Sequence, residues 1–200
     1  MDGISGVILA GGRSSRMGQN KALLELGEKT IIEGQILELS KEFAPLIVVS
    51  NQPELYSFLG ARVIQDQYPG YGPLAGIHAG LQAAPGNGAF VIPCDMPFIT
   101  AELGLELVSR LEGADGVVLS SCGKLEPLCA VYHKRCLPVI EEFLQAKHLK
   151  IIDFYPLVNI RVLPAEDLAL SRSAAEQLFN INTPAELHEA RSILGPGKQP

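Results

Sequence analysis

Short apolar runs that alternate with longer amphipathic stretches constrain the fold of this chain more than any other feature of its sequence. The runs lie at residues 7–10, 46–49, 61–64, 89–92 and 116–119. Each is continuously apolar rather than alternating, a pattern typical of strands that are covered by helices on both faces. The sequence therefore predicts an α/β fold with three layers, in which one mostly parallel sheet lies between two layers of helices.

One further run predicts an exception to the parallel arrangement. Residues 128–132 form an apolar run that follows the run at 116–119 too closely for a helical crossover. A hairpin is the connection that fits, so one strand of the sheet is predicted to be antiparallel. Residues 164–177 show no clear period, and we expect a mobile loop or a short helix there.

Capping residues mark where two of the helices begin. Thr30 and Glu33 form one predicted capping box, and Thr183 and Glu186 form another, with a proline at the first helical position. A third predicted helix follows a segment rich in glycine and proline and ends near Ala84.

Length and charge narrow the possible organisation. A chain of 200 residues fits one domain, predicted over 1–194, with a disordered tail at 195–200. A net charge of −6 argues against extensive contact with nucleic acid, although a local basic cluster could hold a phosphate group. No apolar stretch approaches the length of a membrane span and no basic leader precedes the first run, so we expect a cytoplasmic protein without membrane contact.

The four cysteines do not have the spacing of a metal site. No pair follows the Cys-x-x-Cys pattern, and no histidine lies nearby at a metal-binding spacing. We expect them to act as small apolar residues that stay reduced. They are Cys94, Cys122, Cys129 and Cys136.

The motif with the clearest chemistry follows the first apolar run. Residues 9–18 read Leu-Ala-Gly-Gly-Arg-Ser-Ser-Arg-Met-Gly, and Lys21 follows shortly after. Gly11 and Gly12 would let backbone N–H groups approach an anion, while Arg16 and Lys21 supply the charge that a triphosphate needs. A glycine-rich turn with solvated basic residues is the alternative. The spacing matches neither the Gly-x-Gly-x-x-Gly fingerprint nor the Walker loop.

A carboxylate follows the predicted strand at 89–92. Asp95 lies at its carboxyl end, where open α/β sheets bind ligands. Mg²⁺ commonly takes one or two carboxylates and completes its shell with water and phosphate oxygens, so Asp95 is the predicted ligand of Mg²⁺. The alternative is a helix or turn cap.

Three other polar or glycine-rich segments are candidates for binding. Residues 68–76 could close over a base or an acceptor, or form a rigid turn. Asp66 could touch a sugar or cap a turn. Asn180 and Asn182 precede the helix predicted after Thr183, and capping explains Thr183 but not both asparagines.

Taken together, five segments in this order resemble those of the molybdenum cofactor guanylyltransferases. The segments are residues 9–21, 72–76, 93–97, 126–132 and 180–184. The resemblance spans nearly the whole chain. It implies a single Rossmann-like α/β domain that transfers GMP from GTP to molybdopterin carrying molybdenum, which yields the guanine dinucleotide cofactor.

The resemblance also implies roles for individual residues. Catalytic roles fall on Arg16, Lys21 and Asp95, the first two at the phosphates and the last at Mg²⁺. The nucleotide site is implied at Leu9, Ala10, Gly11, Gly12, Asn51 and Asp66. Asn51 is the candidate for the family's asparagine after the second strand, with Ser50 beside it. The cleft and its pterin side are implied at Gly72, Gly76, Asn180 and Asn182.

Two alternatives stay open at this point. Molybdopterin cytidylyltransferases are similar but favour Leu-Ala-Ala-Gly in the first loop, where this chain has Gly11, so GTP is favoured over CTP. Sugar-phosphate nucleotidyltransferases are more distant. A nucleotide-binding regulatory module without catalysis is the other class. Transient contacts with molybdenum-insertion proteins and molybdoenzyme chaperones are also expected from the resemblance.

Overall fold

A seven-stranded sheet organises the computed structural model of the protein, which describes residues 3–11 and 20–195. The strand order is β5-β4-β1-β6-β8-β7-β9, and β8 alone runs antiparallel to its neighbours. This confirms the predicted α/β fold with a mostly parallel sheet and one antiparallel strand. The strands are β1 (Ile4–Leu9), β4 (Leu46–Val49), β5 (Arg62–Ile64), β6 (Gly88–Pro93), β7 (Gly116–Ser121), β8 (Lys124–His133) and β9 (Ile160–Pro164).

The six predicted strands all form, and the hairpin of β7 and β8 is confirmed. The edge strand β9 was not predicted. Its residues are mostly half-buried or exposed, so it lacks the apolar run that marks the other strands. In the 164–177 segment the structure has a short α-helix, α5 (Ala174–Gln177), together with a 3-10 turn.

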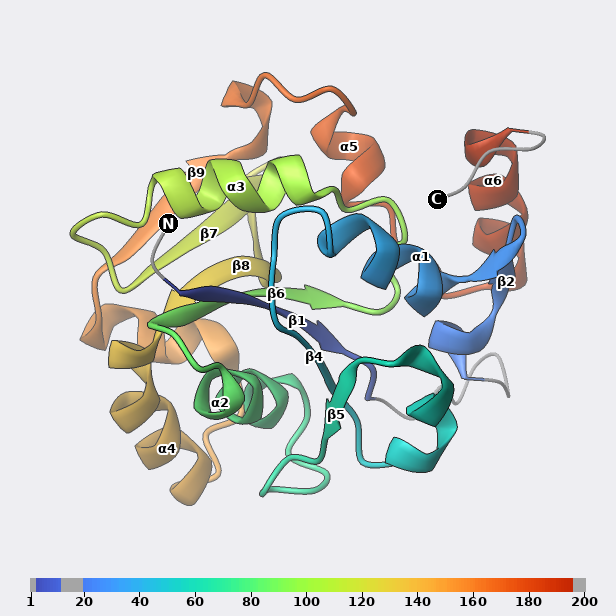
Figure 1. Ribbon diagram of the computed structural model, residues 1–200. Coiled ribbons are helices and arrows are strands. Elements are labelled where there is room, and N and C mark those ends of the chain that lie inside the picture. Colours follow the sequence, from blue (N-terminus) through green and yellow to red (C-terminus); the bar gives the residue numbers. More distant parts are fainter. Residues whose placement is uncertain (1–2, 12–19, 196–200) are drawn as a thin grey trace.

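Helices cover the two faces of the sheet (Figure 1). One face carries α2 (Pro73–Ala83) and α4 (Leu137–Gln145), and the other carries α1 (Ile31–Leu39), α3 (Ala101–Ser109) and α5. Short 3-10 turns connect several elements. They are η1 (Lys21–Leu23), η2 (Pro53–Leu59), η3 (Lys134–Cys136), η4 (Ile151–Leu157) and η5 (Ala165–Asp167).

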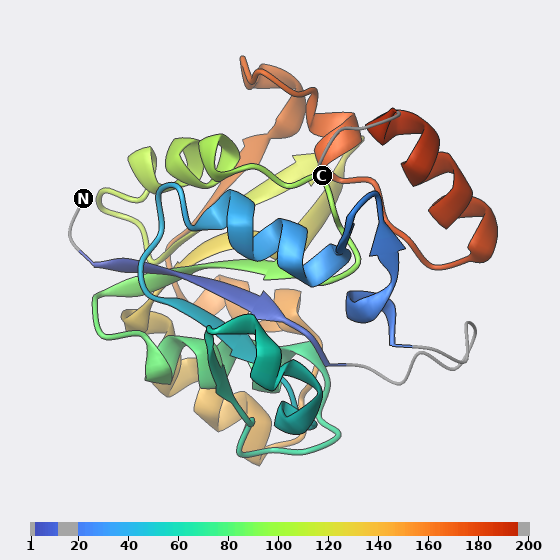
Figure 2. The ribbon, with the colours of Figure 1, turned by 45° about the vertical axis from the view of Figure 1, so that its right-hand side comes forward.

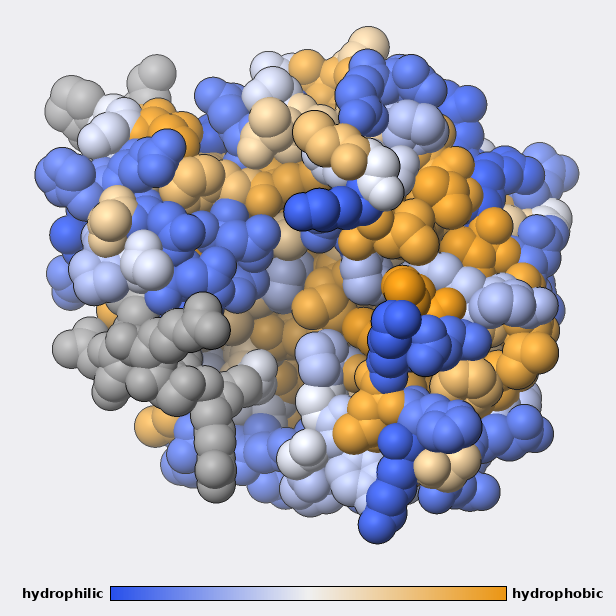
Figure 3. All heavy atoms as spheres, turned by 180° about the vertical axis from the view of Figure 1, so that it is seen from behind, coloured by the Kyte–Doolittle hydropathy of each residue, from blue (hydrophilic) through white to orange (hydrophobic). Residues whose placement is uncertain are grey.

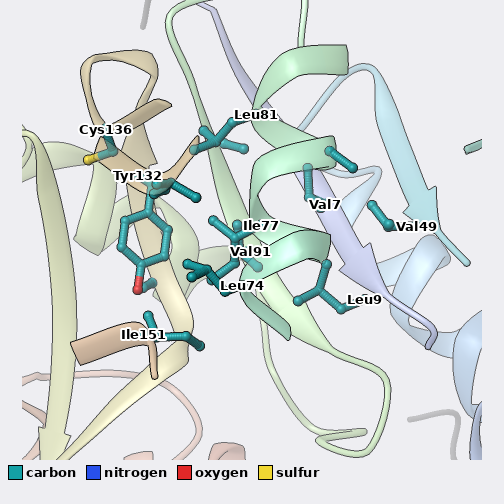
Figure 4. Close-up of a cluster of buried hydrophobic side chains, with 14 of the residues drawn as sticks. Val7, Leu9, Val49, Leu74, Ile77, Leu81, Val91, Tyr132, Cys136 and Ile151 are labelled. Carbon is teal, nitrogen blue, oxygen red and sulfur yellow. The ribbon is translucent and has the colours of Figure 1, made fainter. Parts of the chain in front are cut away.

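The central strand β1 shows why continuous apolar runs predicted this fold. Val7 and Leu9 belong to the core on the α2 side, whereas Ile8 belongs to the core beneath α1 and α3. Figure 4 shows Val7 and Leu9 beside the α2 residues Leu74 and Ile77. Because successive side chains of a strand point to opposite faces, a strand buried on both faces needs an apolar residue at every position.

A smaller unit lies at the edge of the sheet where the parallel strands end. The ribbon of β2 (Glu25–Leu26) and β3 (Lys29–Thr30) lies beside α6 (Pro184–Leu194), as Figure 2 shows. Leu26, Ile31 and Leu187 share a third apolar cluster there. Both predicted capping boxes are present, at the first turns of α1 and α6.

The surface of the molecule carries both apolar and hydrophilic residues. Figure 3 views the molecule from behind and shows apolar and hydrophilic residues interspersed over that face, with apolar residues near its centre and hydrophilic residues gathered mainly on the left of the view. Within residues 3–11 and 20–195, no helix has the length and apolar character to cross a membrane. The domain limit at residue 194 stays a prediction, and residues 196–200 of the predicted tail lie outside the described residues.

Candidate active site

The ends of β1 and β6 bring the two main sequence motifs to one edge of the sheet. Leu9 pairs with Pro93 in the parallel ladder, and the Cys94 N–H donates a hydrogen bond to Leu9 O at 3.1 Å. The chain leaves β1 toward Gly11 and leaves β6 toward Asp95 at this same edge. Ligands of open α/β sheets bind outside such carboxyl ends.

Three polar side chains from distant parts of the sequence meet here. Lys21 Nζ donates a hydrogen bond to Asn182 Oδ1 at 2.7 Å and lies 3.4 Å from Asp95 Oδ2. The side chains of Lys21 and Asp95 are 17% and 26% exposed, so both are accessible to a ligand from one side. We call Lys21, Asp95 and Asn182 the Lys21 cluster. The structure thus brings together two predicted catalytic residues and one predicted acceptor-side residue.

The backbone fixes Asn182 against Asp95. The Ile181 N–H donates a hydrogen bond to Asp95 O at 2.8 Å, which ties the segment before α6 to the turn after β6. The Asn182 N–H donates to Glu186 Oε2 at 2.6 Å, in continuity with the capping box at Thr183. That hydrogen bond is the main reason that the pKa of Glu186 lies below its usual value.

A buried glutamine holds the turn that carries Asp95. Gln35 of α1 is 1% exposed, and its Nε2 donates hydrogen bonds to Pro93 O at 2.9 Å and to Met96 O at 3.0 Å. These carbonyls flank Asp95 in the sequence. Gln35 Oε1 is buried and accepts no hydrogen bond from the described residues. Sequence reasoning missed Gln35; its only signal was an amide among the apolar residues of the first helix.

The residue next to Asp95 is a cysteine whose thiol stays protonated at neutral pH. Burial raises the pKa of the Cys94 thiol to about 12, so the thiol is neutral at pH 7. The thiolate is the reactive form of cysteine. The site therefore offers charge and hydrogen bonds rather than a covalent intermediate on cysteine.

The donor set at Asp95 fits a magnesium ion that is bound mainly by its substrate. Asp95 Oδ2 faces Lys21, whereas no described residue donates a hydrogen bond to Asp95 Oδ1. Among residues 3–11 and 20–195, no group of three or more His, Cys, Asp or Glu side chains could hold a metal by itself. One carboxylate oxygen without a hydrogen-bond donor among the described residues would suit Mg²⁺, which is usually held by one or two carboxylates together with phosphates and water.

A second polar pair lies at the ends of β4 and β5. Asn51 Nδ2 donates a hydrogen bond to Asp66 Oδ2 at 2.6 Å; Asn51 is exposed and Asp66 is half-buried. Asp66 Oδ1 also accepts from the Tyr68 N–H at 2.9 Å. Ser50 is 4% exposed, so Asn51 rather than Ser50 offers its side chain to solvent. We call these two residues the Asn51–Asp66 pair.

The predicted residues around the first loop have different surroundings. Leu9 and Ala10 are each 7% exposed, so they offer a ligand mainly their backbone. A Cβ atom on Gly11 would meet no atom of the described residues within 4 Å, whereas one on Gly76 would lie 3.0 Å from a Leu9 methyl. Gly76 therefore lets α2 approach β1. Gly72 precedes α2 with a φ of 73°, a conformation that favours glycine.

Not every predicted residue joins the Lys21 cluster. The side chain of Asn180 donates a hydrogen bond to Leu178 O at 3.1 Å. Among the described residues it makes no hydrogen bond to Lys21 or Asp95. Gly12 and Arg16, which were predicted to bind phosphate, lie outside the described residues.

Comparison with known proteins identifies the family to which this geometry belongs. The family model of the MobA-like NTP transferase domain matches residues 6–156. A probable molybdenum cofactor guanylyltransferase of Carboxydothermus hydrogenoformans is 42% identical over 97% of this chain and 98% of its own length. Another from Pelotomaculum thermopropionicum is 45% identical over 94% of this chain and 91% of its own length.

A solved structure supports the same conclusion. Molybdopterin-guanine dinucleotide biosynthesis protein A of Archaeoglobus fulgidus is similar with a TM-score of 0.84 and 28% identity, over 95% of this chain and 98% of that protein. The chain belongs to the MobA-like NTP transferase family and, within it, to the molybdenum cofactor guanylyltransferases.

Proposed function

We propose that this protein transfers GMP from GTP to molybdopterin that carries molybdenum, forming the guanine dinucleotide cofactor and pyrophosphate. The observation that carries the proposal is the Lys21 cluster, in which an ammonium group, a carboxylate and an amide meet at the carboxyl edge of the sheet. The family membership gives the donor and the acceptor. The geometry of the Lys21 cluster supplies the charged groups that the reaction between them requires.

The reaction needs positioning and charge neutralisation more than proton transfer. The acceptor is a phosphate monoester, whose second pKa of about 6 leaves it largely ionised at neutral pH. One of its oxygens attacks the α-phosphorus of GTP, forming a new phosphorus–oxygen bond while the bond between that phosphorus and the bridging oxygen of the β-phosphate breaks. Pyrophosphate leaves with the electron pair of that bond, so the reaction needs no general base.

Each member of the Lys21 cluster has a role in this reaction. Lys21 neutralises charge on the phosphates and on the departing pyrophosphate. Asn182 holds the Lys21 ammonium group through its 2.7 Å hydrogen bond, so that the charge is in place before the substrate binds. Asp95 would hold Mg²⁺ through its free oxygen. When bound, the ion would polarise the phosphate oxygens of GTP.

The nucleoside would lie on the other side of the β1 carboxyl end. There the exposed Asn51 and the half-buried Asp66 offer an amide and a carboxylate to the ribose or the base. A Cβ placed on Gly11 would have no atom of the described residues within 4 Å, which supports a nucleotide site beside this residue. The cytidylyltransferase alternative differs at this position, and GTP is therefore the proposed donor.

The decisive experiment supplies both substrates. The purified protein is incubated with Mg²⁺, GTP and molybdenum-loaded molybdopterin, while pyrophosphate release and the mass of the product are measured. We expect release that depends on the acceptor and a product heavier by one GMP unit. A faster reaction with CTP would reverse the base assignment, and tight GTP binding without any release would indicate a regulatory module. Contacts with molybdenum-insertion proteins and molybdoenzyme chaperones stay a prediction.

A further inference from the structure

Tyr56 is buried, although the 3-10 turn η2 that carries it has exposed apolar side chains. Within η2, Tyr56 is 0% exposed, whereas the more apolar Leu55 and Phe58 are 37% and 55% exposed. Hydrophobicity alone would bury the leucine or the phenylalanine first. The contacts of the Tyr56 hydroxyl group account for this inversion.

The hydroxyl group of Tyr56 joins two places that lie ten positions apart in the sequence. It accepts a hydrogen bond from Asn20 Nδ2 at 2.8 Å and donates one to Ala10 O at 3.1 Å. Ala10 directly follows β1, and Asn20 directly precedes η1. The hydroxyl thus fixes the distance between the end of the central strand and the turn that begins with Lys21.

The Asn20 side chain passes this restraint to Lys21. While Asn20 Nδ2 donates to Tyr56, Asn20 Oδ1 accepts from the Ala22 N–H at 3.1 Å and caps η1. Both ends of the Asn20 amide are therefore engaged. Lys21 is the first residue of the capped turn and extends from it to Asn182.

We propose that Tyr56 is a positioning residue for triphosphate binding, which holds Lys21 in register with the carboxyl end of β1. This inference rests on the proposed function, because it assigns Lys21 to the phosphates of a nucleotide. Tyr56 does not touch the substrate. It acts through Asn20, whose side chain caps the turn that begins with Lys21.

The environment of Tyr56 suits this role. Burial raises the pKa of its hydroxyl group, so the group stays protonated and can donate to Ala10 O throughout the neutral range. A phenylalanine would fill the same space but could make neither hydrogen bond. Tyr56→Phe is therefore a substitution that removes the restraint and keeps the packing.

The test compares the binding of nucleotides that differ only in their phosphates. Affinities for GTP and GMP, and in parallel for CTP and CMP, are measured by calorimetry for the wild type and Tyr56→Phe. We expect the triphosphate affinity to fall about tenfold, as for the loss of a buried hydrogen bond that positions a charge, while the monophosphate affinity changes little. Equal losses for both phosphate forms, or no loss for either, would overturn the proposal.

A second tyrosine provides the matched control. The Tyr132 hydroxyl group is also buried and donates to Pro127 O at 2.8 Å beside Tyr155. Tyr132→Phe should lower the melting temperature without changing the ratio of triphosphate to monophosphate affinity. If it changes that ratio as much as Tyr56→Phe does, the effect is general destabilisation and the proposal fails.

The partner residue gives an independent variant should Tyr56→Phe fold poorly. Asn20→Ala removes the same link from the other side and should weaken triphosphate binding similarly. The double variant should then lose little more than Asn20→Ala alone, because Asn20→Ala already removes the link to Tyr56 as well as the cap on η1. Additive losses would contradict the proposal. A wild type that prefers CTP would overturn the proposed donor while leaving this comparison of phosphate forms intact.

Discussion

The Lys21 cluster and the Asn51–Asp66 pair are both polar groups at the carboxyl ends of strands, but they are built in opposite ways. Lys21 is 74 residues from Asp95 and 161 residues from Asn182, and these contacts are partly buried. Asn51 and Asp66 are only 15 residues apart; Asn51 is exposed and Asp66 is half-buried. The cluster is supported by Gln35 and by the Ile181 N–H, whereas the pair is held mainly by its own hydrogen bonds.

This difference suggests that the two regions have different roles in the reaction. Groups that stabilise charge in a reaction are most effective when the fold fixes them in advance, because they need not reorganise as the charge develops. Groups that recognise a nucleoside can adjust as it binds. We therefore expect changes in the Lys21 cluster to act mainly on kcat and changes in the Asn51–Asp66 pair to act mainly on KM.

The largest effects are expected from the Lys21 cluster itself. Lys21→Ala and Asp95→Ala should each lower kcat by about 10³-fold or more, because each removes preorganised charge at the phosphates. Steady-state pyrophosphate release measures this. The exposed pair of Lys150 and Asp153, which lie 3.2 Å apart, supplies the matched controls. Near-normal turnover by Asp95→Ala would disprove the role of Asp95 as the metal ligand.

Support for the Asp95 turn should come next in size. Gln35→Met keeps the volume of the side chain but leaves Pro93 O and Met96 O without their donor, and we expect kcat to fall about 30-fold through loss of preorganisation. The affinity for GTP should become less sensitive to Mg²⁺, which equilibrium binding can measure without turnover.

A second buried glutamine controls for lost stability. Gln177 is 0% exposed and bonds to Thr100 and to Arg172 O, away from Asp95. Gln177→Met should lower the melting temperature to a similar extent with little loss of kcat. If both variants lose activity in proportion to stability, Gln35 has no special role at the site.

A change at Gly11 should alter the preference for the base without altering the Lys21 cluster or the Asn51–Asp66 pair. Because a Cβ atom there would meet no atom of residues 3–11 and 20–195 within 4 Å, Gly11→Ala should leave the melting temperature unchanged. The preference for GTP over CTP should fall about tenfold, as expected when one methyl group enters a binding site. Thermal stabilisation by each nucleotide provides the measurement, and an unchanged preference would show that Gly11 does not select the base.

A change in the Asn51–Asp66 pair should have a smaller effect, and this effect should be on KM rather than on kcat. Asn51→Ala should raise KM for GTP about fivefold and leave kcat nearly unchanged, because it removes one accessible hydrogen-bonding group. Ser50→Ala is the neighbouring control. A large fall in kcat with Asn51→Ala would erase the proposed division between the two regions.

The smallest effect should be a pH dependence of the free energy of unfolding that arises from one buried histidine. His78 of α2 is 1% exposed, packs edge-on against Tyr68, and has neither ring nitrogen hydrogen-bonded within the described residues. Burial lowers the pKa of His78 below 6.5, opposed by Glu141. The unfolded chain therefore binds a proton that the folded protein resists, so stability should fall as the pH drops below about 6.5.

Denaturant titrations at several pH values measure this contribution. His78→Phe should flatten the acid side of the stability profile, with no change in the relative kcat of the Lys21 cluster variants. A profile that keeps the same acid slope in His78→Phe would assign the effect to other groups.

Several elements could be read from local sequence because local chemistry determines them. The strand at 46–49 forms at the predicted residues, and the capping boxes at Thr30 and Thr183 form because side chain and backbone lie within one turn. The edge strand β9 escaped prediction, since its residues gain their hydrogen bonds from β7 while their side chains stay partly exposed. Pairing of that kind depends on a distant neighbour.

The candidate site divides in the same way. The glycine-rich motif, Lys21 and Asp95 carry a recognisable pattern because phosphate chemistry demands charge and close backbone approach. The pattern could not reveal that Asn182, rather than Asn180, meets Lys21, nor that Gln35 and Tyr56 support the site. Those roles follow from which elements pack together.

The fold class, the family and the charged residues of the site could be inferred from the sequence, because apolar periodicity and motif chemistry are local properties. How these residues are held became visible in the folded protein. Hydrogen bonds from α1, η2 and the segment before α6 reach the ends of β1 and β6 across long sequence separations. Such contacts depend on the packing of whole elements, and no local pattern encodes them.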